Sequence, residues 1–317
     1  MKCKVSIIIP VFNVSKYIED CLSSVTNQTM TEGVECILID DCGTDNSVAI
    51  AEAFIKQYNG AITFKIYRHK QNLGPSCARN TGILNACGKY IYFLDSDDYI
   101  EKNCLRNLYK FVEQYKGVDV VQGSYIDDGK GGLPHHPSYS DDKKTIKTWL
   151  LTYNGKILVP HNRLIKRDFI LKNSLFFKNG IIHEDNLWVF YLAKHVSSIA
   201  FCNKQTYYHR CHSNSITGNV DIKQAALSYK TIIEDMCLNI DPFLKGGQKE
   251  FILNNLLTVL NSRYYETNCQ RRQIINTFAK TNNWIERYIL KVILEQKGLL
   301  LKTKLRHLLI RIYKRND

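Results

Sequence analysis

The sequence has few features of a membrane-spanning or disulfide-stabilised protein. No segment approaches the roughly 20 consecutive apolar residues that a membrane-spanning helix needs. The 11 cysteines include no CxxC pair and have no regular spacing, so we expect reduced thiols in the core of a cytoplasmic protein. The apolar segment near the start is too short for a secretory signal and is closed by Pro10 and Asn13, so we interpret it as a first strand.

Acidic residues are outnumbered by basic ones, 30 to 43, which gives a formal net charge of +13. Such a charge fits a nucleic acid, an anionic membrane surface or a phosphorylated substrate as a partner. The length of 317 residues and the apolar fraction of 44% allow one large or two modest domains with an ordinary core.

The first hundred residues alternate between strand and helix patterns. Strand-like apolar runs lie at 5–11, 34–39, 63–67 and 90–94, and helical patterns lie at 15–28, 46–58 and 75–86. Strands separated by helices of this length predict βαβ units, so we expect an α/β fold with a mainly parallel sheet flanked by helices. The pattern then loosens, and we expect a helix at 105–115, a strand at 118–122 and a surface loop at 127–140.

An acidic cluster follows the fourth predicted strand, with the sequence Asp95-Ser96-Asp97-Asp98. Carboxylates this close repel one another, and a divalent cation such as Mg²⁺ or Mn²⁺ would compensate for the repulsion. In an open α/β sheet, ligands bind at the carboxyl ends of the strands, where this cluster lies. The alternative is a solvated acidic turn that only ends the strand.

A second acidic loop begins with Asp40-Asp41, directly after the second predicted strand. A carboxylate at such a strand end can accept a hydrogen bond from the ring N–H of uracil or from ribose hydroxyls. The alternative is a capped turn that leads into the next helix, because Thr44, Asp45 and Asn46 are all good N-cap residues.

A turn at Gly74 and Pro75 leads into the third predicted helix. The N-terminus of that helix carries partial positive charge and Arg79 adds a planar cation one turn later, which suits a diphosphate. Arg79 could equally pair with one of the acidic loops. The segment lacks the GK[ST] ending of a P-loop and the GxGxxG of dinucleotide-binding proteins.

Together these motifs resemble family 2 glycosyltransferases of the GT-A fold. The segments that match in order and spacing are 5–13, 40–45, 72–74 with 79–80, and 94–98, and the resemblance covers roughly residues 1–215. It implies a Rossmann-like GT-A domain that binds a nucleotide sugar. The family usually has Gly-Ser after its paired aspartates, where this chain has Cys42-Gly43, so we expect the glycine hinge to be shifted by one residue.

The resemblance also assigns roles to individual residues. Asp41 matches the aspartate that contacts uracil, and Asp95 and Asp97 match the DxD pair that meets the ribose and the metal. Asp97 and Asp98 are the expected ligands of Mn²⁺ or Mg²⁺, and the choice between them stays open. The residues expected to bind the nucleotide sugar are Pro10, Phe12, Asn13, Asp40, Asp41, Asn72, Arg79, Asp95, Ser96 and Asp97.

The pair Glu184-Asp185 precedes an apolar helical pattern at 187–192. Acidic residues are favoured in the first turn of any helix, which is the alternative interpretation. In the resembled family the matching aspartate removes the acceptor proton, so we expect Asp185 to be the catalytic base and Glu184 to orient it or the acceptor. One base without an enzyme nucleophile predicts inversion at the anomeric carbon.

Two segments nearer the C-terminus carry positive charge. His209 and Arg210 match a Tyr-Arg-rich strand of the family and could reach the diphosphate, or be ordinary strand residues. From about residue 222 the pattern is almost wholly helical, which predicts a catalytic domain at 1–220 and a basic helical region at 221–317. Within it, 284–317 is basic and amphipathic and predicts peripheral contact with the anionic inner face of the cytoplasmic membrane. The alternatives are packing on the catalytic domain or on a second subunit, as a homodimer.

The sequence therefore predicts a metal-dependent, inverting hexosyl- or N-acetylhexosaminyltransferase. We expect it to move a sugar from a UDP-sugar to a hydroxyl of a glycan or lipid-linked acceptor in cell-surface polysaccharide synthesis. A nucleotidyltransferase would need a glycine-rich loop with Arg and Lys after the first strand, where this chain has 12–15 without them. No nucleic-acid partner is expected, because the strand ends are acidic and repel phosphates. A catalytically degenerate nucleotide-sugar-binding protein stays an alternative.

Overall fold

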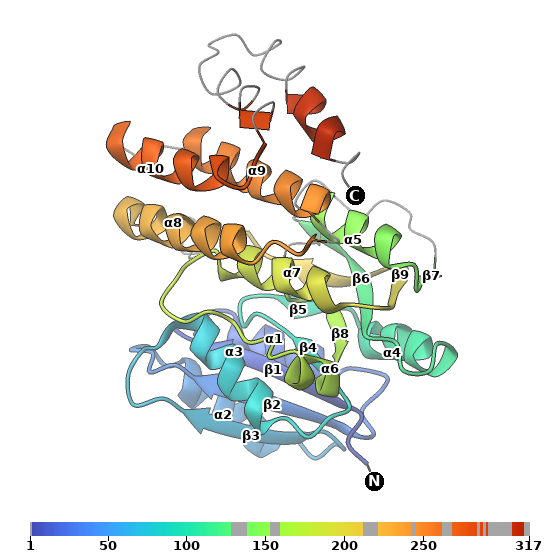
Figure 1. Cartoon of the computed structure of the whole chain (residues 1–317). Coiled ribbons are helices and arrows are strands. Elements are labelled where there is room, and N and C mark those ends of the chain that lie inside the picture. Colours follow the sequence, from blue (N-terminus) through green and yellow to red (C-terminus); the bar gives the residue numbers. More distant parts are fainter. Residues whose placement is uncertain are drawn as a thin grey trace. The chain divides into compact units, whose positions relative to one another are not determined.

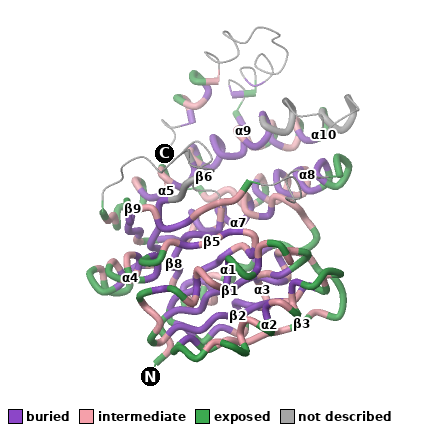
Figure 2. Tube along the Cα trace, turned by 180° about the vertical axis from the view of Figure 1, so that it is seen from behind, coloured by how far each residue is buried: buried purple, intermediate pink, exposed green. Residues whose placement is uncertain are grey.

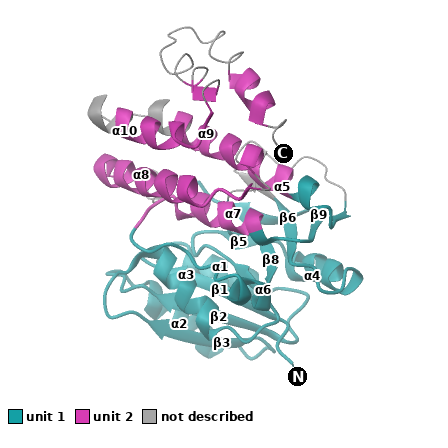
Figure 3. Cartoon of the chain, in the orientation of Figure 1, with its two compact units in different colours: residues 1–146, 159–180, 195–218 teal, residues 147–158, 181–194, 219–317 magenta. Residues whose placement is uncertain are grey.

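The computed structural model describes most of the chain, in two compact units. The described residues are 2–127, 138–152, 159–211, 221–242, 245–261, 268–283, 286–287, 290 and 306–313. Unit 1 comprises residues 1–146, 159–180 and 195–218, and unit 2 comprises 147–158, 181–194 and 219–317 (Figure 3). The predicted boundary at residue 220 stays a prediction.

The N-terminal half of unit 1 consists of alternating strands and helices (Figure 1). Its strands are β1 (Val5–Val11), β2 (Val34–Asp40), β3 (Thr63–Arg68) and β4 (Tyr90–Phe93), and its helices are α1 (Ile18–Thr26), α2 (Ser47–Gln57) and α3 (Gly74–Asn85). All four strands pair in parallel, in the order β3-β2-β1-β4. Strands β1, β2 and β4 are buried on both faces, which explains their continuous apolar sequences (Figure 2).

The rest of unit 1 extends this sheet to nine strands. The added elements are β5 (Tyr99–Ile100), α4 (Cys104–Gln114), β6 (Val120–Asp127), β7 (Tyr139–Ser140), β8 (Arg163–Lys166), α6 (Arg167–Lys172) and β9 (Ile199–His209). The complete order is β3-β2-β1-β4-β8-β6-β9-β5, with β7 paired to β9. Strand β8 is antiparallel to β4 and β6, and β5 and β7 are antiparallel to β9, whereas β6 and β9 are parallel. Hence β1–β4, β6 and β9 share one direction, and the predicted mainly parallel α/β sheet with flanking helices is confirmed.

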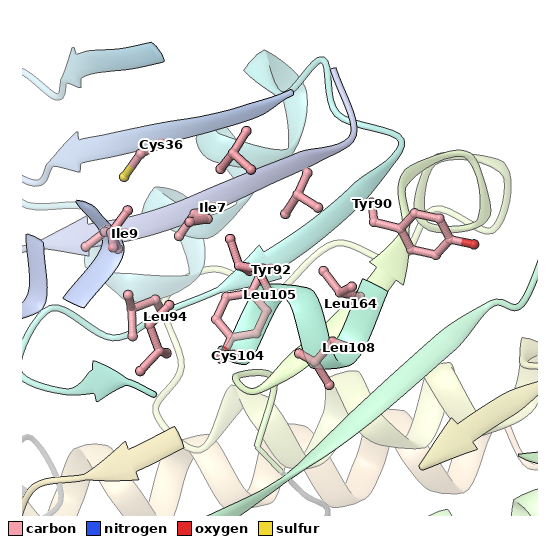
Figure 4. Packing of buried hydrophobic residues seen from close by; sticks show 14 of the residues in the cluster. Ile7, Ile9, Cys36, Tyr90, Tyr92, Leu94, Cys104, Leu105, Leu108 and Leu164 are labelled. Atoms are coloured by element: carbon pink, nitrogen blue, oxygen red, sulfur yellow. The ribbon is translucent and has the colours of Figure 1, made fainter. Parts of the chain in front are cut away.

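Apolar side chains cover both faces of the sheet. One face packs Ile7, Ile9 and Tyr92 against helices α1 and α4, where Leu105 and Leu108 are fully buried (Figure 4). On the opposite face, a Cβ at Gly82 of α3 would lie 2.3 Å from the Ile8 side chain, so only glycine allows this close approach. These contacts hold the carboxyl ends of β1, β2 and β4 at one edge of the sheet.

Unit 2 is helical in the described part of the chain. Its helices include α7 (Glu184–His195), α8 (Ile222–Leu238), α9 (Lys245–Asn261) and α10 (Asn268–Ala279), and α5 (Lys143–Thr152) begins in unit 1. Residues 222–279 therefore confirm the predicted helical extension. Among the described residues, no helix is both long and apolar enough to cross a membrane.

The predicted basic region 284–317 is described only at 286–287, 290 and 306–313. In the last of these segments, Leu309 and Tyr313 are buried and the Tyr313 hydroxyl donates to Asn282 Oδ1 at 2.7 Å. Lys249 of α9 forms a buried ion pair with Glu286 at 2.7 Å. One face of 306–313 thus packs within unit 2, and most of the predicted membrane-facing region lies outside the described residues.

Candidate active site

Asp41 connects the loop after β2 to the start of α3. Its carboxylate accepts hydrogen bonds from the backbone N–H groups of Leu73 and Gly74 at 2.9 and 2.8 Å, and lies 2.6 Å from His69 Nδ1. His69 Nε2 in turn lies 2.9 Å from the hydroxyl of Thr81 in α3. Asp41 is buried, and its hydrogen bonds to Leu73 and Gly74 fix the 72–74 loop, which contains the predicted residue Asn72.

The loops after β1 and β2 are joined through Asn13. Its side-chain oxygen accepts from the backbone N–H of Thr44 at 2.7 Å, and its own backbone is left-handed with φ of 53°. Cys42 is also left-handed, with φ of 59°, and its N–H donates to Asp40 Oδ1 at 3.0 Å. The expected shift of the hinge is therefore wrong, because the left-handed backbone lies at Cys42, where the family has its glycine, and not at Gly43.

Gly43 has a different role, since a Cβ there would lie 3.0 Å from the side-chain oxygen of Asn13. Phe12 is 41% exposed beside this joint and Pro10 is half-buried at the end of β1. The two predicted base-binding loops thus form one connected surface at the carboxyl edge of the sheet.

Arg79, in the second turn of α3, pairs with the acidic cluster. Its guanidinium donates to Asp95 Oδ1 at 3.0 Å and lies over the ring of Phe177, with 5.3 Å to the ring centre. Of the two expectations for this residue, the structure shows the ion pair with an acidic loop. The cation is nonetheless held at the carboxyl end of β4, the position where ligands bind in open α/β sheets.

Asp95 and Asp98 meet His161, a residue that the sequence analysis did not identify. One ligand atom from each of the three lies within 4.8 Å of the others, and His161 Nδ1 lies 3.2 Å from Asp95. His161 precedes β8, and because β8 runs antiparallel to β4, its start lies at the carboxyl edge. The imidazole stacks on Tyr207 of β9, with ring centres 4.4 Å apart.

The two carboxyl groups of this cluster have opposite electrostatic surroundings. Burial alone raises the pKa of Asp95, but the Arg79 guanidinium and the His161 ring outweigh it and hold that pKa well below its usual range. For Asp98, burial and the neighbouring Asp95 and Asp97 carboxylates raise the pKa to about 8. Burial lowers the pKa of His161 and favours its neutral form, which can bind a metal.

Asp98 is also bound to the end of β9. Its carboxylate accepts from the Tyr207 hydroxyl at 2.6 Å and from the backbone N–H of Arg210 at 2.8 Å. The Arg210 guanidinium lies over the rings of Tyr17 and Tyr99 and pairs with Asp20 at 3.2 Å. Arg210 is thus at the carboxyl edge, whereas its predicted contact with a diphosphate stays a prediction.

The cluster fits a divalent cation. Carboxylate oxygens and a neutral imidazole suit Mn²⁺ and also accommodate Mg²⁺ through oxygen ligands. Of the predicted metal ligands, Asp98 belongs to the group of three converging side chains, and Asp97 does not, within the described residues. Asp97 is half-buried, and Ser96, which lies between Asp95 and Asp97 in the sequence, is buried. That Asp97 and Asp98 together bind the metal stays a prediction.

The predicted base lies in unit 2, in the first turn of α7. Glu184 is buried and Asp185 is half-buried. The preceding residue, His183, has a left-handed backbone with φ of 62° and stacks on Tyr229 with ring centres 4.7 Å apart. This arrangement fixes the start of α7 and places the Glu184-Asp185 pair at a helix N-terminus, where negative charge is stabilised.

Known proteins support the resemblance. The sequence model "Glycosyl transferase family 2" matches residues 6–172, more than half of the chain. The glycosyltransferase GlyG of Streptococcus pneumoniae is 33% identical over 67% of this chain and 72% of its own length. The poly(ribitol-phosphate) beta-N-acetylglucosaminyltransferase TarP of Staphylococcus aureus is 28% identical over 90% of each chain. Other relatives are longer, and the chain spans 17 and 23% of the length of two of them.

Solved structures support the fold. The crystal structure of S. aureus TarS residues 1–349 in complex with UDP-GlcNAc superposes with a TM-score of 0.72, at 22% identity, over 99% of this chain and 92% of that one. The family match favours a glycosyltransferase over the nucleotidyltransferase alternative. The sequence and the fold of the chain thus agree, and the chain is a glycosyltransferase that belongs to family 2 and has the GT-A fold.

Proposed function

We propose that the chain transfers a sugar from a UDP-sugar to a hydroxyl group of a glycan or lipid-linked acceptor in cell-surface glycan synthesis. The observation that carries this proposal is the convergence of Asp95, Asp98 and His161 with the Arg79 cation at one edge of the sheet. The TarS complex contains UDP-GlcNAc and TarP is a poly(ribitol-phosphate) beta-N-acetylglucosaminyltransferase, as their names state, and both support the choice of donor and acceptor class.

The loops around Asn13 and Asp41 are the proposed site for the nucleoside. Asn13 fixes the loop after β2, and Asp41 fixes the 72–74 loop before α3. The backbone surface proposed to face the base is therefore preorganised. Phe12 offers an exposed ring beside them. The proposed donor site also includes Pro10, Asp40, Asn72, Ser96 and Asp97.

A divalent cation, Mn²⁺ or Mg²⁺, is the proposed cofactor. Its proposed ligands are Asp97 and Asp98, with Asp95 and His161 added by the structure. A cation bound there would neutralise charge on the diphosphate leaving group. Arg79, held in place by Asp95, would position that group through its fixed cation.

Asp185 is the proposed general base, and Glu184 is proposed to position it or the acceptor. A carboxylate at the start of α7 would accept the proton of the acceptor hydroxyl as that oxygen attacks the anomeric carbon. The bond to the diphosphate then breaks on the opposite face. A single displacement of this kind inverts the anomeric configuration.

The substitution Asp185→Asn tests this role. We expect sugar transfer to fall by roughly 10²- to 10⁴-fold, because a positioned base contributes about that factor. UDP binding, measured by calorimetry, should change less than about threefold, because Asp185 is not among the residues proposed to bind the donor. The matched control is Asp168→Asn, which removes an acidic residue from the first turn of α6. Retained anomeric configuration in the product would overturn the single-displacement mechanism.

The region 284–317 is proposed to contact an anionic membrane. Lys302→Glu and Lys304→Glu together should reduce flotation with vesicles that contain anionic lipid, because each basic residue near the surface contributes about 1 kcal/mol. Neutral vesicles are the control. If both proteins float equally with anionic vesicles, the region serves another contact, and analytical ultracentrifugation then tests the homodimer.

A further inference from the structure

A second cluster of metal-ligating side chains lies at the amino edge of the same sheet. Cys3, Glu35 and Cys87 each offer one ligand atom, and the three atoms lie within 4.8 Å of one another. Cys3 precedes β1, Glu35 is the second residue of β2, and Cys87 precedes β4. The cluster is therefore separated from the carboxyl-edge cluster by the length of β1, which is about 20 Å for seven residues.

The carboxylate of Glu35 is the fixed member of this cluster. Its side chain is 3% exposed and accepts from Lys65 Nζ at 2.8 Å, from the backbone N–H of Cys87 at 2.7 Å and from the Ser6 hydroxyl. These donors hold the carboxylate in one orientation. Oε1 accepts two of these hydrogen bonds and Oε2 accepts one, so Oε2 keeps one of the roughly four lone-pair sites of the carboxylate for a further ligand.

The backbone brings the two thiols to this carboxylate. The N–H of Lys89 donates to the carbonyl of Cys3 at 3.2 Å, and the N–H of Gly88 donates to the Ser6 hydroxyl at 2.8 Å. A Cβ at Gly88 would lie 2.5 Å from the backbone nitrogen of Ser6, so glycine is needed for this approach. Cys87 is exposed and Cys3 is half-buried, which leaves the cluster open to solvent on one side.

We propose that Cys3, Glu35 and Cys87 bind a thiophilic divalent cation, with Zn²⁺ as the physiological candidate. Two sulfur ligands and one oxygen ligand are a zinc donor set, whereas Mg²⁺ and Mn²⁺ prefer oxygen. Tetrahedral zinc, with Zn–S near 2.3 Å, needs ligand atoms about 3.5–3.8 Å apart, so the exposed segment at Cys87 would have to close by at most about 1 Å. The fourth position is open for water.

Binding is a ligand exchange without a redox step. The cation displaces one proton from each thiol, forms two metal–sulfur bonds and one metal–oxygen bond, and releases water from its own shell. Two thiolates and one carboxylate carry three negative charges, which a divalent cation and the Lys65 ammonium together balance. The bound cation would tie the starts of β1, β2 and β4 together.

Titration of the full chain with Cd²⁺ under a phosphine reductant tests the proposal. Cadmium bound to thiolates gives a sulfur-to-metal charge-transfer band, which the oxygen and nitrogen ligands of the carboxyl-edge cluster cannot produce. We expect a band that saturates near one equivalent, is lost in Cys3→Ser and in Cys87→Ser, and is retained in Asp95→Asn. The matched control is Cys42→Ser, which removes an exposed thiol elsewhere in unit 1.

A second measurement uses the unmodified protein, so it does not depend on the folding of any variant. Zn²⁺ should protect Cys3 and Cys87 from alkylation by iodoacetamide, read by mass spectrometry, while Cys42 and Cys211 stay reactive as internal controls. Equal alkylation of all four with and without Zn²⁺, or a band that persists in both serine variants, overturns the proposal. Neither result depends on the transferase activity.

Discussion

The two edges of the central sheet carry different ligand chemistry. At the carboxyl edge, Asp95, Asp98 and His161 present oxygen and nitrogen atoms, and at the amino edge Cys3 and Cys87 present sulfur beside Glu35. Strand β4 carries members of both clusters, whereas β8 contributes only at the carboxyl edge and β1 and β2 only at the amino edge. The difference shows that a sheet fixes where side chains converge, while the residue types decide which cation suits each position.

The edges also differ in how charge is balanced. At the carboxyl edge, Arg79 balances the charge of Asp95, whereas burial and the neighbouring carboxylates raise the pKa of Asp98. At the amino edge, three hydrogen bonds, one of them from the Lys65 ammonium, hold one carboxylate, Glu35. We therefore expect activity to depend on the identity of the acidic residues at the carboxyl edge. Stability should depend on the hydrogen bonds to Glu35 at the amino edge.

Of the substitutions at the two edges, Asp95→Asn should have the largest effect on activity. The change removes the charge that pairs with Arg79 and His161, so we expect sugar transfer to fall by roughly 10²- to 10³-fold. Cys87→Ser at the other edge should stay within about twofold of the wild type, since it touches no proposed donor contact. Initial rates of UDP release measure both. Similar losses in the two variants would mean that the edges are not functionally distinct.

Glu35→Ala should have the largest effect on stability. It leaves the N–H of Cys87 and the Lys65 ammonium without their partner, and we expect the free energy of unfolding to fall by about 3 kcal/mol. The control Glu52→Ala removes an exposed partner of Arg68 and should cost less than about 1 kcal/mol. Urea denaturation of chelator-treated protein measures both, and equal losses would contradict a structural role for Glu35.

A pair of tyrosine substitutions sharpens the comparison. Tyr207→Phe removes a hydrogen bond to the Asp98 carboxylate, and Tyr90→Phe removes one of 2.8 Å to the carbonyl of Val118 near the amino edge. At pH 9, above the raised pKa of Asp98, the carboxyl is ionised; because hydrogen bonds to charged groups contribute more, we expect losses of about 2 and 1 kcal/mol in the free energy of unfolding there. Thermal unfolding of both variants measures the difference. A reversed order would show that Asp98 is neutral in the folded protein.

The smallest expected effect concerns Asp45, in the loop after β2. Burial raises its pKa, but hydrogen bonds from Ser47 and Ser15 outweigh burial and lower the pKa below its usual value. A lowered folded-state pKa stabilises the protein above the unfolded value of about 3.9, and this contribution is lost as the pH falls through the folded value. The difference in melting temperature between wild type and Asp45→Asn should therefore shrink between pH 6 and pH 3. A constant difference would contradict the assignment.

Local patterns predicted the regular elements of unit 1 well. The expected strands at 5–11, 34–39 and 63–67 end within one residue of β1, β2 and β3, because buried parallel strands have continuous apolar sequences. The short strands β5, β7 and β8 were not predicted. They have two to four residues each, which is too few for a periodic pattern to be recognised.

The candidate site was predicted only where its residues belong to a local sequence motif. Asp41 and Asp95 stand at strand ends and were identified, whereas His69, His161 and Tyr207 were not. His161 reaches Asp95 across 66 positions of sequence because β8 runs against β4, and no local signal marks such a contact. The amino-edge cluster was missed for the same reason, since its cysteines are 84 positions apart.

The sequence by itself determined the fold class, the family and the acidic strand ends, because these depend on local periodicity and on motifs in register. Only the tertiary structure decided which side chains meet: Arg79 with Asp95, Asp98 with Tyr207, and Cys3 with Cys87. Strand order and direction set these contacts. They arise from the packing of whole elements and are therefore not encoded in any one segment.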